Sequence, residues 1–134
     1  MSQENVEVVR RVIAAVNERD IDGYLAYCTE DIELRTPWTA IEGVYEGRDA
    51  IRRFFVDLSD TSPDFRLTIE RLEAVSADRV LAFLLVSASG RASGIVVGTD
   101  APTANVYNLV DGKINRIRIF LDRDEALKAV GLAE

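Results

Sequence analysis

The segment 20–55 limits the possible folds of this chain more than any other part of its sequence. A short helical pattern at 21–28 leads directly into an alternating strand pattern at 31–36, which Pro37 stops. A further helical pattern opens at 47–49. The remainder of the chain is mostly strand-like. This order predicts helices that line one side of a curved sheet, so that the two enclose a cone with an interior pocket.

The strand patterns after this segment indicate how the sheet is built. Apolar and polar residues alternate from Phe65 onward, and a change of phase near 70–71 predicts a β-bulge. The run 80–86 is apolar at every position, which is typical of a strand buried on both faces. The segment 95–110 is strand-like, and its internal glycine and proline predict a strong bend or a sheet edge.

Turn and capping residues organise the C-terminal part of the chain. Asp111 and Gly112 predict a tight hairpin that leads into a last strand at 114–121. Asp122 has the position of a helix cap, and Gly131 can end the short helix that follows. We therefore expect a mostly antiparallel sheet followed by a helical tail.

Length and composition favour one domain over the whole chain, 1–134. Apolar residues at spacings of three and four predict a first helix at 3–18. Hydrophobic residues make up 48% of the sequence, which suffices for a core without disulfides or metals. The expected fold class is α+β: a cone-shaped roll with N-terminal helices packed on a strongly curved, mostly antiparallel sheet, and a short C-terminal helix.

The sequence contains no histidine. This removes the commonest general base near neutral pH and the commonest metal ligand, and it excludes Ser-His-Asp and Cys-His catalytic sets. The single cysteine, Cys28, falls among apolar residues and is expected to be a buried, inert thiol. Acid–base chemistry would have to come from Asp, Glu, Tyr or a bound cofactor, and the sequence itself predicts neither a cofactor nor a metal site.

Charge and hydropathy exclude two kinds of partner. Acidic residues outnumber basic ones 23 to 16, giving a net charge of −7 that repels nucleic acid. The longest apolar run, 80–86, is too short to cross a bilayer, and the polar start of the chain does not resemble a signal peptide. With one cysteine, the chain fits a reducing compartment. We expect a cytoplasmic protein without a nucleic-acid or membrane partner.

Four segments together resemble one protein superfamily. They are EDIELRTP at 30–37, EGRDAIRRFF at 46–55, GRASG at 90–94 and VYNLVDGKINRIRIFLDRDEALKAVGL at 106–132. Their order and spacing resemble the SnoaL-like branch of the nuclear-transport-factor-2-like superfamily, which has ketosteroid isomerases, polyketide cyclases and limonene-epoxide hydrolases as relatives. The resemblance implies a hydrophobic pocket and pairing into dimers through the outer face of the sheet. It implies no single activity, because the superfamily hosts both enzymes and binding-only members.

The resemblance also allows the relatives' catalytic positions to be located here. Ketosteroid isomerases use a tyrosine on the first helix, an acid on a late strand and a proton-transferring aspartate before the proline that ends the first strand. These positions fall on Val12, Val106 and Thr36. The aspartate of the cyclases, and one acid of the epoxide hydrolases, falls on Ile119. None of these residues can act as a carboxylate base, so the known chemistries are expected to be absent.

The pocket is expected to contain a few polar groups among apolar walls. Asn105 and Tyr107 share one face of a strand and Val106 has the other, and the sequence leaves open whether Asn105 or Val106 faces inward. Thr36 is expected to point into the cone, and Trp38 to cover its mouth. The expected pocket residues are Tyr24, Thr36, Trp38, Phe55, Asn105, Tyr107, Ile117 and Ile119.

Three functions remain open at this point. The first is a binder of a small, largely apolar molecule, forming a homodimer through a face that carries Arg116, Arg118 and Phe120. The second is an isomerase, cyclase or hydrolase that acts on a small steroid-like or polyketide-like substrate with a non-standard acid, for which Asp100 is the candidate. The third is a protein-interaction module that uses the outer face of the sheet.

Overall fold

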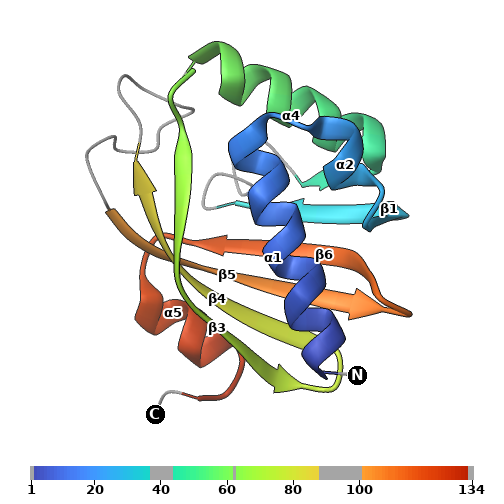
Figure 1. Cartoon of the computed structure of the whole chain (residues 1–134). Helices are drawn as coiled ribbons and strands as arrows, with labels where there is room; N and C mark the ends of the chain where they lie inside the picture. Colours follow the sequence, from blue (N-terminus) through green and yellow to red (C-terminus); the bar gives the residue numbers. More distant parts are fainter. Residues whose placement is uncertain (1, 37–43, 62, 88–100, 133–134) are drawn as a thin grey trace.

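The computed structural model describes residues 2–36, 44–61, 63–87 and 101–132. Its elements are, in chain order, α1 (Ser2–Glu18), α2 (Ile21–Leu25), β1 (Cys28–Arg35), β2 (Tyr45–Glu46), α4 (Arg48–Thr61), β3 (Arg66–Ser76), β4 (Arg79–Ser87), β5 (Ala101–Val110), β6 (Lys113–Phe120) and α5 (Arg123–Ala129). Within these residues the strands form one six-stranded, curved sheet in the order β2-β1-β6-β5-β4-β3 (Figure 1). The expected α+β class is confirmed.

Strands β1 and β6 pair in parallel, whereas every other neighbouring pair of the sheet is antiparallel. The Cα register of the parallel pair places Leu34 opposite Ile117 and Arg35 opposite Arg118. Parallel neighbours need a crossover connection rather than a tight turn. Here the chain between β1 and β6 contains α4 and the strands β3, β4 and β5, so the sheet is mixed and mostly antiparallel.

The two faces of the sheet bury different cores. Helices α1, α2 and α4 lie on the inner face, where the larger core contains the fully buried Ile13, Ile51 and Ile117 (Figure 1). Helix α5 lies on the opposite face, which we call the outer face, and its Ala126 packs in a smaller core with Val106. The three N-terminal helices and the sheet therefore enclose the space in which a pocket can form.

Two boundaries near the start of the sheet differ from expectation. Helix α2 ends at Leu25 rather than at 28, and β1 begins at Cys28 rather than at 31. The cause is the contact with β6: the amide of Ile114 donates to the carbonyl oxygen of Tyr27 at 2.7 Å, and Cys28 is in register with Ile114. Strand β6, more than eighty residues further along the chain, pairs with these residues and makes them part of the strand. The local periodicity of the sequence contains no sign of this distant contact.

The expected turns and bulge are confirmed. The register of β3 against β4 shifts between Ile69 and Arg71, which is the bulge expected at 70–71. Asp111 and Gly112 have φ angles of 50° and 77°, the left-handed pair that a two-residue hairpin requires. Gly131, with φ 78°, follows α5 as a left-handed C-terminal cap.

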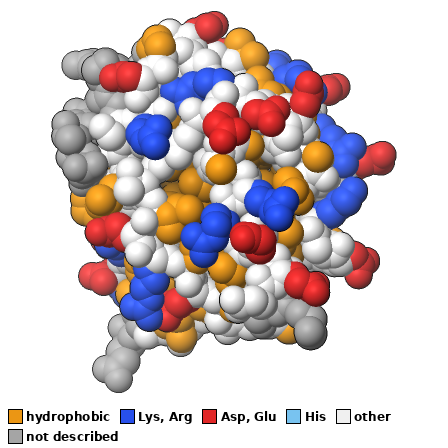
Figure 2. Space-filling view, viewed as in Figure 1, with side chains coloured by type: hydrophobic (Ala, Val, Ile, Leu, Met, Phe, Trp, Pro, Cys, Tyr) orange, Lys and Arg blue, Asp and Glu red, His pale blue; other side chains and the backbone are white. Residues whose placement is uncertain are grey.

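The strand expected at 95–110 is described from Ala101 onward, because residues 88–100 lie outside the described residues. In the part of the chain that the structure describes, no helix has the length and apolar character needed to cross a membrane. On the face seen in Figure 2, basic and acidic side chains are interspersed around patches of apolar atoms.

Arg123, the first residue of α5, joins this helix to three strands. Its Nε donates to the carbonyl oxygen of Thr103 at 3.0 Å, and its Nη2 donates to that of Leu84 at 2.8 Å. The same Nη2 forms an ion pair with Glu70, and the guanidinium carbon lies 5.5 Å from the ring centroid of Phe83. Arg123 therefore fixes α5 against β3, β4 and β5.

Replacement of Arg123 by Leu should lower the free energy of unfolding by about 2–3 kcal/mol, because hydrogen bonds from a charged donor contribute about 1.5–3 kcal/mol each and are not additive. Urea denaturation followed by circular dichroism measures the change. The control is Lys128→Ala on the exposed side of the same helix, expected to change stability by less than about 0.5 kcal/mol. Equal losses for the two variants would contradict the anchoring role of Arg123.

Candidate functional site

A cavity lies between the inner face of the sheet and the helices. The volume that the centre of a water molecule can occupy in this cavity is about 70 Å³. By this measure one water molecule needs roughly 10–15 Å³, so roughly five to seven waters fit. Since each water occupies about 30 Å³ of liquid, a molecule of roughly 150–210 Å³ would fill the cavity.

Apolar side chains from both layers form most of the cavity wall. Helix α4 contributes Phe54 and Phe55, and strand β6 contributes Ile117 and Ile119. Tyr24 of α2 packs edge-on against Phe55, with ring centroids 4.6 Å apart. This is the geometry that aromatic pairs prefer, so the two rings fix one another at the wall.

Four polar side chains line the cavity among the described residues: Tyr24, Thr103, Asn105 and Tyr107, all of them buried. Asn105 and Tyr107 point inward from β5, and the Nδ2 of Asn105 donates to the Oη of Tyr107 at 3.1 Å. Val106 points the other way, into the smaller core with α5. The alternation of a strand therefore places Asn105, and not Val106, at the cavity.

The ionisable groups of this region are neutral near pH 7. Burial raises the pKa of Tyr107 to about 12, against an opposing effect of the hydrogen bond from Asn105. Burial also raises the pKa of Tyr24 well above its usual value. Burial raises the pKa of Cys28, whose Sγ donates to the carbonyl oxygen of Tyr24, to about 12, with the charge of Arg48 acting in the opposite direction. Tyr107 accepts from Asn105, so its own proton is available to a ligand.

The structure brings most of the expected pocket residues together. Those that line the cavity are Tyr24, Phe55, Asn105, Tyr107, Ile117 and Ile119. Thr36 does not line it: it is buried at the wall of a separate, open hollow beside Arg35 and Arg118. Thr36 is the first residue after β1, which ends at Arg35, so it lies at the end of the strand beside the hollow and not over the cavity. Trp38 and Asp100 lie outside the described residues.

Sequence reasoning missed Thr103. This residue lies two and four positions before Asn105 and Tyr107 on β5, and it shares their face of the strand. The same period of two that placed Asn105 and Tyr107 together would have found it. Thr103 was not identified because Pro102, directly before it, suggested irregular structure at this point of the chain.

The positions that hold catalytic groups in the relatives do not supply a base here. Val12 is fully buried in the larger core, and Val106 faces away from the cavity. Only Ile119 of these positions lines the cavity, and it is apolar. Of the residues that the structure describes, no Asp or Glu lines the cavity, and no three His, Cys, Asp or Glu side chains are grouped as metal ligands.

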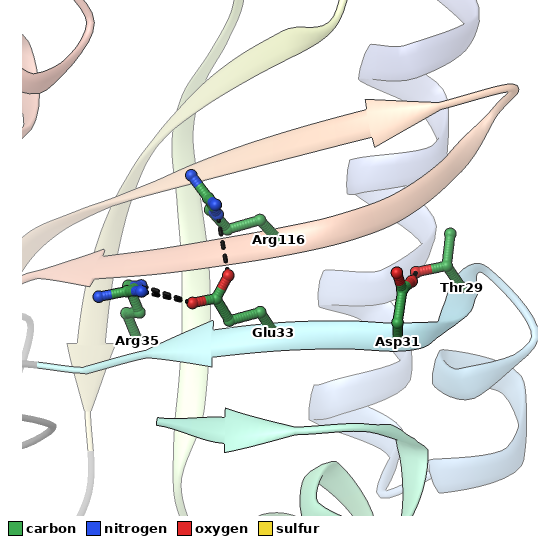
Figure 3. Close-up of polar contacts among 5 residues, drawn as sticks. All are labelled: Thr29, Asp31, Glu33, Arg35 and Arg116. Carbon is green, nitrogen blue, oxygen red and sulfur yellow. Dashed lines mark hydrogen bonds and ion pairs between the residues drawn. The ribbon is translucent and has the colours of Figure 1, made fainter. Parts of the chain in front are cut away.

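The outer face carries the residues expected at a dimer contact. Arg116 is exposed, and its Nε donates to Glu33 at 3.1 Å; Glu33 also pairs with Arg35 at 2.7 Å (Figure 3). Arg118 and Phe120 are half-buried, and Phe120 packs against the smaller core with α5. Part of the expected contact is therefore covered by the chain's own helix, and the homodimer stays a prediction.

The ionisation of Tyr107 tests the geometry of the cavity. At pH 11 about one tenth of Tyr107 should be ionised, against about nine tenths for a tyrosine of ordinary pKa. Burial of the neutral Tyr107 hydroxyl favours the folded state fully below about pH 10. This contribution to stability is lost as the pH rises to about 12, where Tyr107 ionises. The tyrosinate absorbance of the wild type minus that of Tyr107→Phe reports this residue. A difference centred near pH 10 would contradict the burial.

Comparison with known proteins agrees with this architecture. Residues 9–117 match the family model described as a SnoaL-like domain. No curated protein gives a significant match to the sequence. The solved structure of TerC co-crystallized with polyporic acid is 21% identical, covers 95% of this chain and 98% of its own, and has a TM-score of 0.74.

Two further solved structures have the same fold. A candidate polyketide cyclase from Sinorhizobium meliloti is 18% identical over 89% of this chain and 98% of its own, with a TM-score of 0.71. A candidate ketosteroid isomerase from Kribbella flavida is 21% identical over 88% of this chain and 77% of its own, with a TM-score of 0.69. Since the family model covers most of the chain, this protein belongs to the SnoaL-like domain family and has its nuclear-transport-factor-2-like fold.

Proposed function

We propose that this protein binds a small, largely apolar molecule with one oxygen acceptor, and holds it in the cavity without converting it. The observation that carries the proposal is the composition of the cavity: apolar walls, a buried Asn105–Tyr107 hydrogen bond, and no carboxylate among the described lining residues. Ligand sites commonly combine an apolar lining with a few placed polar groups. The structure of TerC with polyporic acid is a precedent for a small organic molecule with this fold.

Two physical effects would contribute to the free energy of binding. Burial of the ligand's apolar surface contributes about 25 cal/mol per Å² removed from water. The hydroxyl of Tyr107 then selects for a ligand oxygen, because a ligand without an acceptor leaves this buried donor unsatisfied. Burial of apolar surface gives affinity for many small molecules, and the hydroxyl of Tyr107 selects among them those that carry an oxygen acceptor.

An enzyme remains the alternative, and the family relationship favours it. Proton transfer at neutral pH needs a group whose pKa lies near the working pH. Tyr24 and Tyr107 have pKa values raised by burial, so they can donate a hydrogen bond but are poor bases. An isomerase or cyclase of this fold would therefore need an acid outside the described residues, and Asp100 is the candidate that the sequence offers.

We also infer a cytoplasmic homodimer, with one physical condition on its contact. In a symmetric dimer the same surface meets itself. Pairing centred on Arg116 and Arg118 would bring like charges together, so the copies should meet away from these two residues. The buried, free thiol of Cys28 fits a reducing compartment.

The binding proposal predicts a difference between two ligands of similar size. Acetophenone should bind more tightly than ethylbenzene by about three- to tenfold, because one net hydrogen bond contributes about 0.5–1.5 kcal/mol. Tyr107→Phe should remove most of this preference. Tyr27→Phe is the matched control, because Tyr27 is only half-buried and does not line the cavity. Isothermal titration calorimetry measures all six affinities, those of the wild type and the two variants for each ligand.

Two results would contradict the binding proposal. If the wild type binds neither ligand, the cavity is not a ligand site. If Tyr107→Phe and Tyr27→Phe change the preference for acetophenone equally, Tyr107 does not hold the ligand oxygen.

The absence of conversion is tested by proton exchange. The methyl protons next to the carbonyl of acetophenone exchange with deuterated water when a base removes them. We expect the protein to leave this exchange at its buffer rate, because the described cavity holds no group that is basic at pH 7. Proton NMR follows the loss of the methyl signal. Acceleration that disappears in Asp100→Asn would instead support the enzyme alternative.

A further inference from the structure

Four arginines lie together on the outer face of the sheet, beside α5. The Cα register places Arg35 opposite Arg118, and it places Arg116 and Arg79 on either side of Asn108. The four arginines therefore belong to strands β1, β4 and β6, and they occupy neighbouring positions on the outer face. We call Arg35, Arg79, Arg116 and Arg118 the arginine cluster.

The arginine cluster is only partly neutralised. Among the described residues, Glu33 is the carboxylate that pairs with it, and Glu33 lies between Arg35 and Arg116 (Figure 3). One carboxylate thus faces four guanidinium groups, on a chain whose net charge is −7. The like charges of neighbouring arginines repel one another, so a negative charge added near the cluster would be stabilised.

Arg118 is the member of the cluster with the least compensation. Its side chain is half-buried, and its Nε is buried without an acceptor among the described residues. Burial lowers the pKa of Arg118, and the charges of Arg116, Arg79 and Arg35 lower it further. A buried donor with no acceptor is unfavourable, and Arg118 has this cost in addition to a charge that no carboxylate of the described residues pairs with.

A hollow of about 380 Å³ opens next to Arg118, where β1 and β6 end. Arg35, Thr36 and Arg118 line it together with the apolar residues 119–121. Asp122 and Glu125, at the start of α5, also line it. The hollow therefore combines two guanidinium groups and an apolar surface with two carboxylates.

The acids of the hollow leave the arginines free for a ligand. The carboxylate of Asp122 accepts from the amide of Asp124 at 2.8 Å and caps α5. Neither Asp122 nor Glu125 forms an ion pair with Arg118 in the part of the chain that the structure describes. Arg118 thus keeps its capacity to bind a carboxylate through two parallel N–H groups.

We propose that this hollow, which shares Ile119 and Leu121 with the wall of the inner cavity, is a second ligand site, and that it binds a small organic acid with an apolar ring or chain. The carboxylate pairs with Arg118 and Arg35, and the apolar part rests on Phe120 and Leu121. The apolar surface favours an organic acid over a bare inorganic anion. A second copy of the chain fits less well, because symmetric pairing would oppose one arginine cluster to another.

Benzoate is the probe for this site, with benzamide as its neutral analogue and sulfate as the bare anion. In the full-length, ¹⁵N-labelled protein, the Nε–H signal of Arg118 is assigned by its loss in Arg118→Gln. We expect benzoate to shift this signal and to saturate it, while benzamide leaves it in place and sulfate binds more weakly.

Variants separate a built site from a general positive charge. Arg118→Gln should weaken benzoate binding about tenfold to a hundredfold, because a charge-assisted, bidentate contact is lost. Arg79→Gln removes the same charge from the cluster but does not line the hollow, so it should change the affinity by less than about threefold at physiological salt. Isothermal titration calorimetry of both variants gives the comparison.

Several results would overturn the proposal. Equal weakening by Arg79→Gln and Arg118→Gln would mean that only the overall charge attracts benzoate. Sulfate binding as tight as benzoate binding would indicate an adventitious ion only. A loss of benzoate binding in Tyr107→Phe, with Arg118→Gln unchanged, would place benzoate in the inner cavity. No shift of the Arg118 signal at millimolar benzoate would mean that the hollow binds no organic acid.

Discussion

The parallel pairing of β1 with β6 is the interaction on which the rest of this structure depends. It joins the first strand of the chain to the last, so α2 and α4, which pack against β1, are held beside β6. The cavity wall then combines Tyr24 and Phe55 from the helices with Ile117 from β6. On the outer face the same register places Arg35 beside Arg118. One long-range ladder thus builds both candidate sites.

Strand alternation gives the two faces of this ladder different chemistry. Along β6, Ile117 and Ile119 face the cavity, while Arg116 and Arg118 face outward. Because the period of a strand is two, a slip of one residue would exchange these sets and bury the arginines. The apolar cavity and the charged outer face are therefore two results of one register, and the burial of the isoleucines fixes the position of the guanidinium groups.

The sequence predicted what depends on local pattern and failed where distant contacts decide. Alternation within one strand places Asn105 and Tyr107 on one face and Val106 and Asn108 on the other. The structure was needed only to show which of the two faces points into the cavity. Thr36 follows β1, whose pairing with β6 ends at Arg35, and it lines the hollow beside Arg35 and not the cavity. The same pairing moved the start of β1 to Cys28. Neither effect leaves a local signature in the sequence.

The cavity also explains how one fold can serve both catalysis and binding. A carboxylate in an apolar cavity is costly to ionise, and relatives that use one accept this cost to move a proton. Here the described cavity holds hydroxyl and amide groups, and the hydrogen bond between Asn105 and Tyr107 offsets part of their desolvation. Such a set stays neutral over a wide pH range, so under the binding proposal the affinity would not depend on the protonation of these groups. A carboxylate in the same place would make the affinity depend on pH, and it could transfer a proton.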